Sequence, residues 1–208
     1  MKKVKDPNRL RFKDYFGSSA MAVAEAVGAC LMSSMFMMYL TDYSGLGKLG
    51  AVLGSTVLVF ARFFDAVNDP LEGWIMDRAK VGKHGKYRPF LLLSTILMAA
   101  GLIGLFSIPV GENPNVVLIG AWVIIFYLLY DIGVAFFALN PMLRTMTLNP
   151  DERGKLMIGP RMVSMMMGMI GASLIAIITG VNAGIGNMRT SFSIVITVFV
   201  AIGTVISL

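Results

Sequence analysis

The amino-acid sequence predicts an all-α polytopic membrane protein, and three observations support that fold class. Of the 208 residues, 56% are hydrophobic and 14% are charged, and the mean hydropathy is +0.75. The apolar residues form six long runs, each close to the roughly 20 residues that a helix needs to cross a bilayer. Lys and Arg gather mainly between these runs. Together these observations exclude a soluble globular protein.

The six runs give the predicted domain organisation in chain order. Residues 1–14 are polar and precede a bundle of six transmembrane helices over residues 15–208. The first two runs exceed the length that a bilayer requires, which indicates tilted helices or cytoplasmic extensions. Short Gly- and Pro-containing segments, typical of turns, join several of the runs. The predicted spans lie near residues 15–40, 49–75, 90–110, 116–139, 157–181 and 188–208.

The basic residues predict the orientation of the bundle. The first 14 residues, the segment 78–88 and the segment 149–156 hold 13 of the 18 Lys and Arg, whereas the opposite loops hold Lys48 and Arg189. Cytoplasmic segments next to membrane helices are enriched in these residues. Both chain ends are therefore predicted to be cytoplasmic in a multi-pass protein of the plasma membrane. Basic residues in these positions indicate contact with anionic membrane lipid and argue against a nucleic-acid partner.

The fifth run contains a repeat of small residues that bears on helix packing. Gly168, Ala172, Ala176 and Gly180 recur every four residues and so share one helix face. Small residues at that spacing let two helices approach closely in lipid. The repeat predicts a close helix contact on this face, with the ordinary abundance of Gly and Ala as the alternative explanation.

The second run carries charged residues on one side of the predicted helix. Arg62, Asp65, Asp69 and Glu72 recur at helical spacing, with Asn68 half a turn wider. Each ionised group near the bilayer centre costs about 3 kcal/mol or more, so such residues normally face a partner or a water-filled cavity. A structural Arg–Asp network between helices is one explanation, and a cation-binding site is the one that we favour. Glu72 lies nearer the cytoplasmic exit and receives no assignment.

The oxygen atoms in this stripe predict which residues bind the cation. Asp65 and Asp69 lie one turn apart, and two carboxylates that close favour a bound cation or a shared proton. Asn68 adds a neutral carbonyl oxygen, and Pro70 cannot donate to the carbonyl one turn earlier. We therefore predict cation binding by Asp65, Asn68 and Asp69, with Asp65 and Asp69 as metal ligands if the ion is Na⁺. Arg62 is the predicted ion-pair partner when the cation is absent.

Two further carboxylates lie well inside apolar runs. Glu25 is about ten residues from the start of the first run, and Asp131 lies in the fourth run near two tyrosines. Carboxylates accept hydrogen bonds from sugar hydroxyls, and tyrosine rings offer apolar surface to a sugar. We predict that Glu25 and Asp131 bind substrate. A structural pairing of Asp131 with Arg144 or Arg161 is the alternative.

Two sequence motifs resemble those of one transporter superfamily. The segment 73–88 resembles the signature loop between helices two and three of the major facilitator superfamily. The segment from Ala61 to Trp74 is similar to the helix-two signature of its glycoside–pentoside–hexuronide:cation symporters. The resemblance runs over nearly the whole chain and implies the N-terminal six-helix bundle of a major facilitator fold. The residues that match the loop signature, and for which the resemblance implies a conformational-switch role, are Gly73, Asp77, Arg78, Gly82, Lys83 and Arg88.

The resemblance also implies binding roles, and it fails at some positions. The implied cation site is the same three residues of the second run, and the implied sugar-binding arginine is Arg161 on the fifth helix. The sugar-binding aspartates of the family fall at Ala26, beside Glu25, and at Phe136. Because those two carboxylates are missing, the resemblance implies a carrier of small solutes but does not identify the solute.

These features predict the N-terminal half of a cation-coupled secondary transporter for a sugar, glycoside or related small solute, working by alternating access. The predicted coupling ion is Na⁺ or H⁺, with Li⁺ as a further candidate, and no cofactor is expected. The predicted partners are membrane lipid, the small-molecule substrate, and either a missing C-terminal six-helix half or a second chain. The alternatives are a non-transporting membrane partner or assembly subunit, and a carrier of another solute class such as lysolipid. An enzyme is not expected, because the sequence shows no nucleophile–base set, phosphate loop or zinc spacing.

Overall fold

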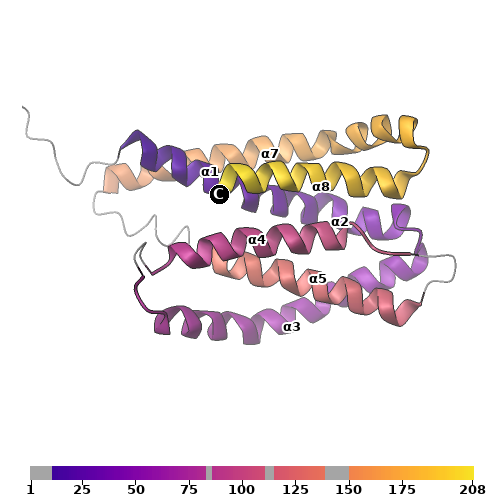
Figure 1. Cartoon of the computed structure of the whole chain (residues 1–208), viewed down its shortest axis with the longest axis horizontal. Coiled ribbons are helices and arrows are strands. Elements are labelled where there is room, and N and C mark those ends of the chain that lie inside the picture. Colours follow the sequence, from indigo (N-terminus) through magenta and orange to yellow (C-terminus); the bar gives the residue numbers. More distant parts are fainter. Residues whose placement is uncertain (1–10, 83–85, 111–114, 139–149) are drawn as a thin grey trace, which may run out of the picture.

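The computed structural model describes residues 11–82, 86–110, 115–138 and 150–208, and long helices dominate these ranges (Figure 1). Six helices in this part of the chain are long and apolar enough to cross a membrane. The predicted fold class, an all-α polytopic membrane protein, is therefore confirmed. The elements are α1 (Phe12–Cys30), η1 (Leu31–Met35), α2 (Phe36–Met38), η2 (Tyr39–Tyr43), α3 (Lys48–Arg78), α4 (Arg88–Leu105), α5 (Val116–Phe137), α7 (Pro150–Ile185) and α8 (Met188–Ser207).

Several helix ends differ from the apolar runs that located the helices. α1 begins at Phe12, inside the segment predicted as the polar N-terminus, because the Asp14 carboxylate accepts the backbone N–H of the preceding cap residue at 2.7 Å. α7 begins at Pro150, which suits a first turn because the N–H that it lacks has no helical acceptor there. α4 ends at Leu105, short of residue 110, and Pro109 then prevents the helix from resuming. Hydropathy locates the apolar centre of a helix and misses such polar or Pro-containing ends.

The first membrane helix runs through α1, η1, α2 and η2 without a break, and η1 and η2 are wide π turns. At the end of η2 the N–H of Ser44 donates to the carbonyl of Tyr39, five residues earlier, at 2.7 Å. α3 approaches this part of the helix closely, so that a Cβ at Gly50 would lie 1.8 Å from the carbonyl oxygen of Leu40. Glycine is therefore required where the second membrane helix leaves the first.

α4 and α5 pack face to face through two glycines. A Cβ at Gly101 would lie 2.5 Å from the backbone nitrogen of Tyr130, and a Cβ at Gly133 would lie 2.9 Å from the carbonyl oxygen of Ser94. Neither position has room for a side chain, so the two backbones meet directly. This contact fixes the height and rotation of α5, and with them the position of its charged residue, Asp131.

A hydroxyl group joins α8 to α1 at one end of the bundle. The Ser207 Oγ donates to the carbonyl oxygen of Ala20 at 3.0 Å and accepts the backbone N–H of Ala24 at 2.9 Å. The Ser207 side chain also reaches the carbonyl of Gly203 in its own helix at 2.9 Å. These bonds hold α1 in a fixed register against α8.

α7 packs against α1 through a face that differs from the predicted one. A Cβ at Gly171 would lie 2.0 Å from the Cys30 Sγ, and one at Gly159 would lie 2.1 Å from the Ser19 Oγ. The predicted small-residue face is turned away from this contact, because the residues at 168, 172, 176 and 180 are all exposed. The prediction that this face makes a close helix contact is thus wrong for the described bundle. The contact follows the neighbouring helix face, which also carries the buried Leu174.

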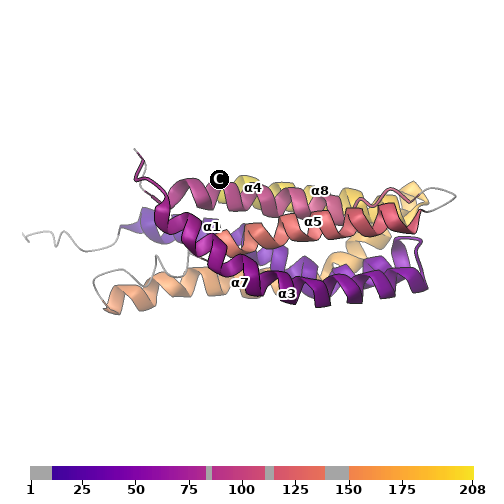
Figure 2. The same ribbon diagram turned by 90° about the horizontal axis from the view of Figure 1, so that it is seen from below.

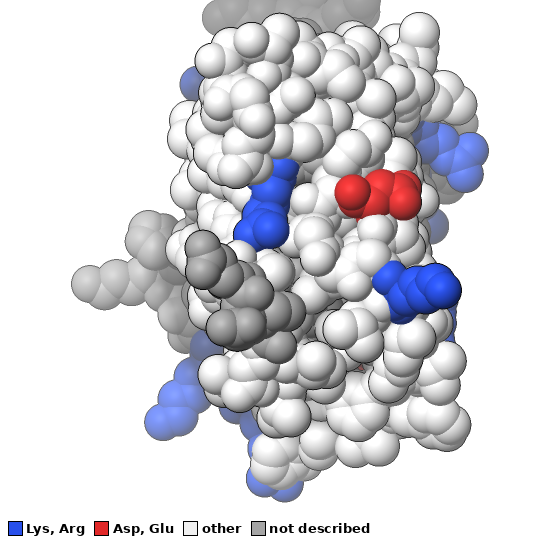
Figure 3. All heavy atoms as spheres, turned by 90° about the vertical axis from the view of Figure 1, so that its right-hand side faces the viewer, with Lys and Arg blue, Asp and Glu red and all other residues white. Residues whose placement is uncertain are grey.

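The bundle has two long sides that differ in their neighbours. Figure 2 shows α4 and α8 along its upper side and α3 and α7 along its lower side, where α3 packs on α5 and α7 packs on α1. The end of the molecule seen in Figure 3 is largely free of charged side chains. At the opposite end, exposed Arg78, Arg88 and Lys155 lie near the ends of α3, α4 and α7. The predicted orientation rests on this asymmetry of charge.

Candidate functional site

The acidic residues of the second membrane helix lie on a stretch of α3 that stays helical through Pro70. Asp65 and Asn68 are half-buried, Asp69 is exposed, and Glu72 is buried. Because Pro70 has no N–H, the carbonyl one turn earlier loses its helical donor. That oxygen is a further acceptor close to the carboxylates, which makes this stretch rich in oxygen ligands.

Arg62 forms an ion pair with Asp65 on the same helix. The Arg62 Nη1 lies 3.9 Å from the Asp65 Oδ2, and the side chains are 87% and 32% exposed. An ion pair that is this exposed in water contributes about 0–1 kcal/mol. The pairing is therefore weak enough for another cation to replace the guanidinium.

Asp131 of α5 lies beside the acidic residues of α3. Its carboxyl group is within hydrogen-bonding reach of the Asp65 carboxyl group and within electrostatic range of Asp69 and Glu72. Two carboxyl groups can approach this closely when a proton or another cation lies between them. The packing of α3 on α5 thus brings together two acids that are far apart in the sequence.

Two tyrosines connect this acidic group to the first membrane helix. Tyr127 lies within electrostatic range of Asp131 and Asp65. Tyr130 is buried, lies within electrostatic range of Asp131 and also of Glu25 on α1, and packs against α1 where Gly28 leaves room. A Cβ at Gly28 would lie 2.9 Å from the Tyr130 ring. Glu25, which is half-buried, therefore lies on the α1 side of the same polar region.

Arg161 occupies a different part of the bundle. It is exposed on α7, a helix that packs against α1 and α8. Among the described residues, Arg161 makes no ion pair with the carboxylates of α3 or α5. The structure therefore brings together Asp65, Asn68, Asp69 and Asp131, with Glu25 reached through Tyr130, and leaves Arg161 apart from them.

The predicted conformational-switch loop lies at the charged end of the bundle. The Arg78 guanidinium stacks over the Trp74 ring with its Cζ 4.1 Å from the ring centre. The Lys86 Nζ donates to the backbone carbonyl oxygen of Asp77 at 2.8 Å and so joins the two flanks of the loop. Gly73 is half-buried, and the predicted residues Asp77, Arg78, Gly82 and Arg88 are exposed. Lys83 lies outside the described residues.

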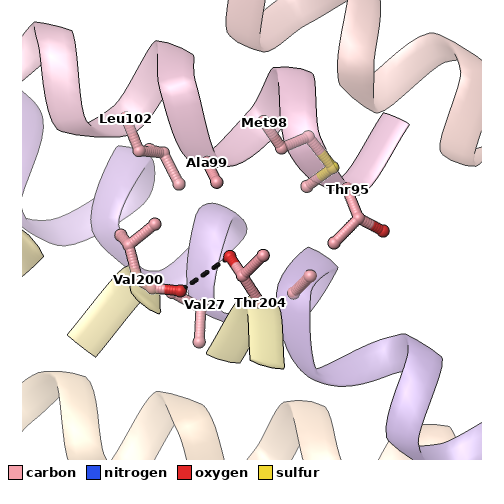
Figure 4. A pocket seen from close by; sticks show the side chains of 8 residues that line it. Val27, Thr95, Met98, Ala99, Leu102, Val200 and Thr204 are labelled. Carbon is pink, nitrogen blue, oxygen red and sulfur yellow. Dashed lines mark hydrogen bonds between the residues drawn. The ribbon is translucent and has the colours of Figure 1, made fainter. Parts of the chain in front are cut away.

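Two hollows lie away from the acidic residues. A cavity of about 10 Å³ lies between α1, α4 and α8, where Thr95, Met98 and Thr204 are among its lining side chains (Figure 4). That space is about the size of one water molecule. A groove of about 620 Å³ lies at one end of the same three helices, beside Phe16, Arg88 and Leu208.

The acidic residues do not form a ready-made metal site. Within the described ranges, no group of three His, Cys, Asp or Glu side chains is arranged to hold a metal ion. The assignment of Asp65 and Asp69 as Na⁺ ligands stays a prediction.

Sequence reasoning left two contacts of this region unassigned. The Asn68 Nδ2 donates to the Glu72 Oε1, and the four-residue spacing of Asn68 and Glu72 was a signal that could have revealed this bond. The approach of Asp131 to Asp65 had no signal in one sequence, because it depends on how α3 and α5 pack.

A bundle of membrane-length helices with several acids on one region of its surface is typical of ion-coupled membrane transport proteins. The MFS/sugar transport protein family matches residues 16–208. This chain therefore belongs to that family, and its six helices form the N-terminal bundle of a major facilitator fold. The family consists of transporters, in agreement with the prediction that the chain is not an enzyme.

Individual relatives are named as transporters of different solutes. An uncharacterized symporter of Bacillus subtilis (strain 168) is 29% identical over 120 residues, covering 55% of this chain and 24% of the relative. The lactose permease of Lactobacillus helveticus is 29% identical over 138 residues, covering 60% and 21%. The sodium-dependent lysophosphatidylcholine symporter 1-A of Danio rerio is 28% identical over 115 residues, covering 55% and 20%. In each case the match spans less than a third of the relative.

Proposed function

We propose that this chain forms the N-terminal half of a cation-coupled transporter for a sugar, glycoside or related small solute. The observation that carries the proposal is the approach of Asp131 on α5 to Asp65 on α3, with Asp69 one turn away. Carboxylates gathered at membrane depth repel one another unless a cation or proton is bound. A cation that neutralises them changes the packing of α3 against α5, which is the kind of element that alternating access requires.

The proposed coupling ion is Na⁺ or H⁺, transported as a substrate, with Li⁺ as a further candidate. Asp65, Asn68 and Asp69 supply oxygen atoms from α3, which suit a hard cation. Arg62 occupies the Asp65 carboxylate when no cation is bound, at 3.9 Å and largely exposed to solvent. Exchange between the guanidinium and the cation then requires no buried charge to be left without a partner.

The proposed solute side lies toward α1 and α7. Glu25 and Arg161 offer a carboxylate and a guanidinium to hydroxyl or carboxylate groups of a solute. The buried Tyr130 lies between Glu25 and Asp131. This arrangement supports coupling, because a solute that binds at Glu25 acts on the side chain that also contacts the acidic region. The relatives named for lactose and for lysophosphatidylcholine define two solute classes to test.

The exposed faces of α3 and α7 support a second six-helix unit that completes the transporter. Phe63 is 72% exposed, and Met165 and Met169 on α7 are 71% and 77% exposed. α3 and α7 run along the same side of the bundle (Figure 2). A further half of the protein or a second chain would cover this side and enclose the polar residues between the two units. The basic end of the bundle supports cytoplasmic chain termini in the plasma membrane.

Uptake into proteoliposomes tests this function. The protein is reconstituted and supplied with labelled glycosides, and separately with lysophosphatidylcholine, under an imposed Na⁺, Li⁺ or pH gradient. We expect gradient-driven uptake that is lost in Asp69→Asn, because the substitution removes the exposed charge of the cation site. Asp42→Asn is the matched control, since Asp42 is an exposed acid at the other end of the bundle.

Direct cation binding covers the case in which the second six-helix unit is required for uptake. We expect calorimetric titration with Na⁺ and Li⁺, and proton uptake measured with a pH indicator, to show binding in Asp42→Asn but not in Asp69→Asn. Binding or uptake that is the same in both variants contradicts the proposal.

A further inference from the structure

Glu72 differs from the other acids of α3 in its burial. Its side chain is 3% exposed, whereas Asp69, less than one turn away, is exposed. The Glu72 Oε1 accepts a hydrogen bond from the Asn68 Nδ2. The Glu72 Oε2 is buried and has no hydrogen-bond partner among the described residues. A buried carboxylate oxygen without a partner carries a large desolvation penalty as long as the group is ionised.

The charged groups that surround Glu72 increase this penalty. Asp65 and Asp69 on α3 lie within electrostatic range of Glu72, and so does Asp131, the one charged residue of α5. The other elements that pack against α3 are α2 and η2, whose charged residue, Asp42, is at the far end of the bundle. The charged side chains that these elements place near Glu72 are therefore all acidic.

Arg62 cannot neutralise Glu72. Arg62 lies ten residues earlier on the same helix, about 15 Å along its axis. Its guanidinium already lies against Asp65.

We propose that Glu72 is a proton-binding site, with the proton on Oε2 while Oε1 accepts from Asn68. The inference rests on the proposed function and deepens it, because a proton bound and released at Glu72 makes H⁺ a coupling ion of this protein. Binding forms one O–H bond on Oε2 and release breaks it, with water as the proton donor or acceptor. No other group is changed.

The hydrogen bond from Asn68 links the proton site to the predicted cation ligands. Because the Asn68 Nδ2 is engaged by Glu72, the Asn68 Oδ1 remains as the acceptor of that side chain. Loss of the proton makes Glu72 an anion and strengthens the bond from Asn68. The state of Glu72 is thereby transmitted to a residue one turn closer to Asp65.

Infrared spectroscopy of the reconstituted full chain tests the proposal without requiring transport. The C=O stretching band of protonated carboxyl groups is followed in lipid bilayers as the pH is raised from mildly acidic to mildly alkaline. We expect a protonated component at neutral pH that disappears at higher pH. This component should be lost in Glu72→Gln, which retains an oxygen that accepts from Asn68, and kept in Asp77→Asn, which removes an exposed acid of the same helix.

Two further variants keep the test decisive. In Asn68→Ala the component should persist and shift in frequency, because its C=O loses a hydrogen bond; this reading stands even if Glu72→Gln fails to fold. A component that is unchanged in Glu72→Gln, or is lost in Asp131→Asn and kept in Glu72→Gln, overturns the proposal. If Asp69→Asn abolishes cation-dependent uptake while Glu72→Gln leaves the infrared band unchanged, the proton site fails and the proposed function stands. If the band is lost in Glu72→Gln while Asp69→Asn has no effect on uptake or cation binding, the proposed function fails instead.

Discussion

Buried polar side chains are treated differently on the two sides of this bundle. On the side of α4 and α8, the buried residues Ser94, Thr95, Ser191 and Ser207 each donate a hydroxyl to a backbone carbonyl, at 2.7 to 3.0 Å. On α3, the buried Glu72 has one oxygen that lacks a partner among the described residues. A buried polar group that is fully hydrogen-bonded contributes to structure, and one that is not needs a ligand, a proton or a functional explanation.

The difference follows from the chemistry of the side chains. A serine or threonine hydroxyl in a helix reaches a carbonyl three or four residues earlier, so it is satisfied without help from another helix. A carboxylate finds no donor in its own helix backbone and depends on other side chains. The comparison therefore teaches that α4 and α8 form a self-sufficient scaffold, whereas α3 and α5 form a region whose charges need an external partner.

The strongest test of this comparison removes the contact that connects the two regions. A leucine in place of Gly101 would collide with the backbone of Tyr130, since even a Cβ would lie 2.5 Å from its nitrogen. We expect Gly101→Leu to destabilise the bundle by about 3 kcal/mol and to abolish cation binding, because α5 moves and Asp131 leaves Asp65. Thermal unfolding in detergent and cation titration measure the two effects.

Gly168→Leu is the matched control for that substitution. A Cβ at Gly168 would have no atom within 4 Å, and the residue is exposed on α7. We expect the unfolding temperature of this variant to equal that of the unsubstituted protein. Equal stability of Gly101→Leu and Gly168→Leu would show that the α4–α5 contact does not position the acidic region.

A smaller effect is expected where the scaffold is joined by a hydroxyl group. Ser207 bonds to two backbone groups of α1, so Ser207→Ala leaves both without that partner. We expect a loss of about 1 kcal/mol with cation binding unchanged. Ser173→Ala is the control, because Ser173 is exposed and its hydroxyl bonds within its own helix. If Ser207→Ala weakens cation binding, the scaffold is not independent of the acidic region.

The sequence was sufficient to predict the scaffold, because bilayer thickness and charge distribution constrain it strongly. The six helices and their family follow from apolar length and from the motif around Asp65 and Asp69. The face by which α7 meets α1 did not follow, since a repeat of small residues and the face that is used, with Gly159 and Gly171, look alike in one sequence. Which face contacts a neighbour depends on the rotation of each helix in the bundle, and local spacing does not determine it.

The acidic region was predictable along α3 but not across to α5. Spacing alone places Asp65, Asn68 and Asp69 on one side of a helix, and it also places Glu72 there. It does not reveal that Glu72 is buried while Asp69 is exposed, because that depends on which neighbouring side chains cover α3. Asp131 was identified as a polar residue at membrane depth, and its position beside Asp65 required the packing of α5.

The smallest expected effect concerns the contact between opposite charges in the acidic region, that of Arg62 with Asp65. Arg62 is 87% exposed, so Arg62→Gln should change the free energy of unfolding by less than about 1 kcal/mol. The same substitution removes the cation that competes for the Asp65 carboxylate, and we therefore expect cation affinity to rise by a few-fold. Arg62→Lys, which keeps the charge, should leave affinity near its original value. A fall in affinity in Arg62→Gln would mean that Arg62 holds Asp65 in its binding position, and α3 would then resemble the self-sufficient scaffold more than a region that awaits a ligand.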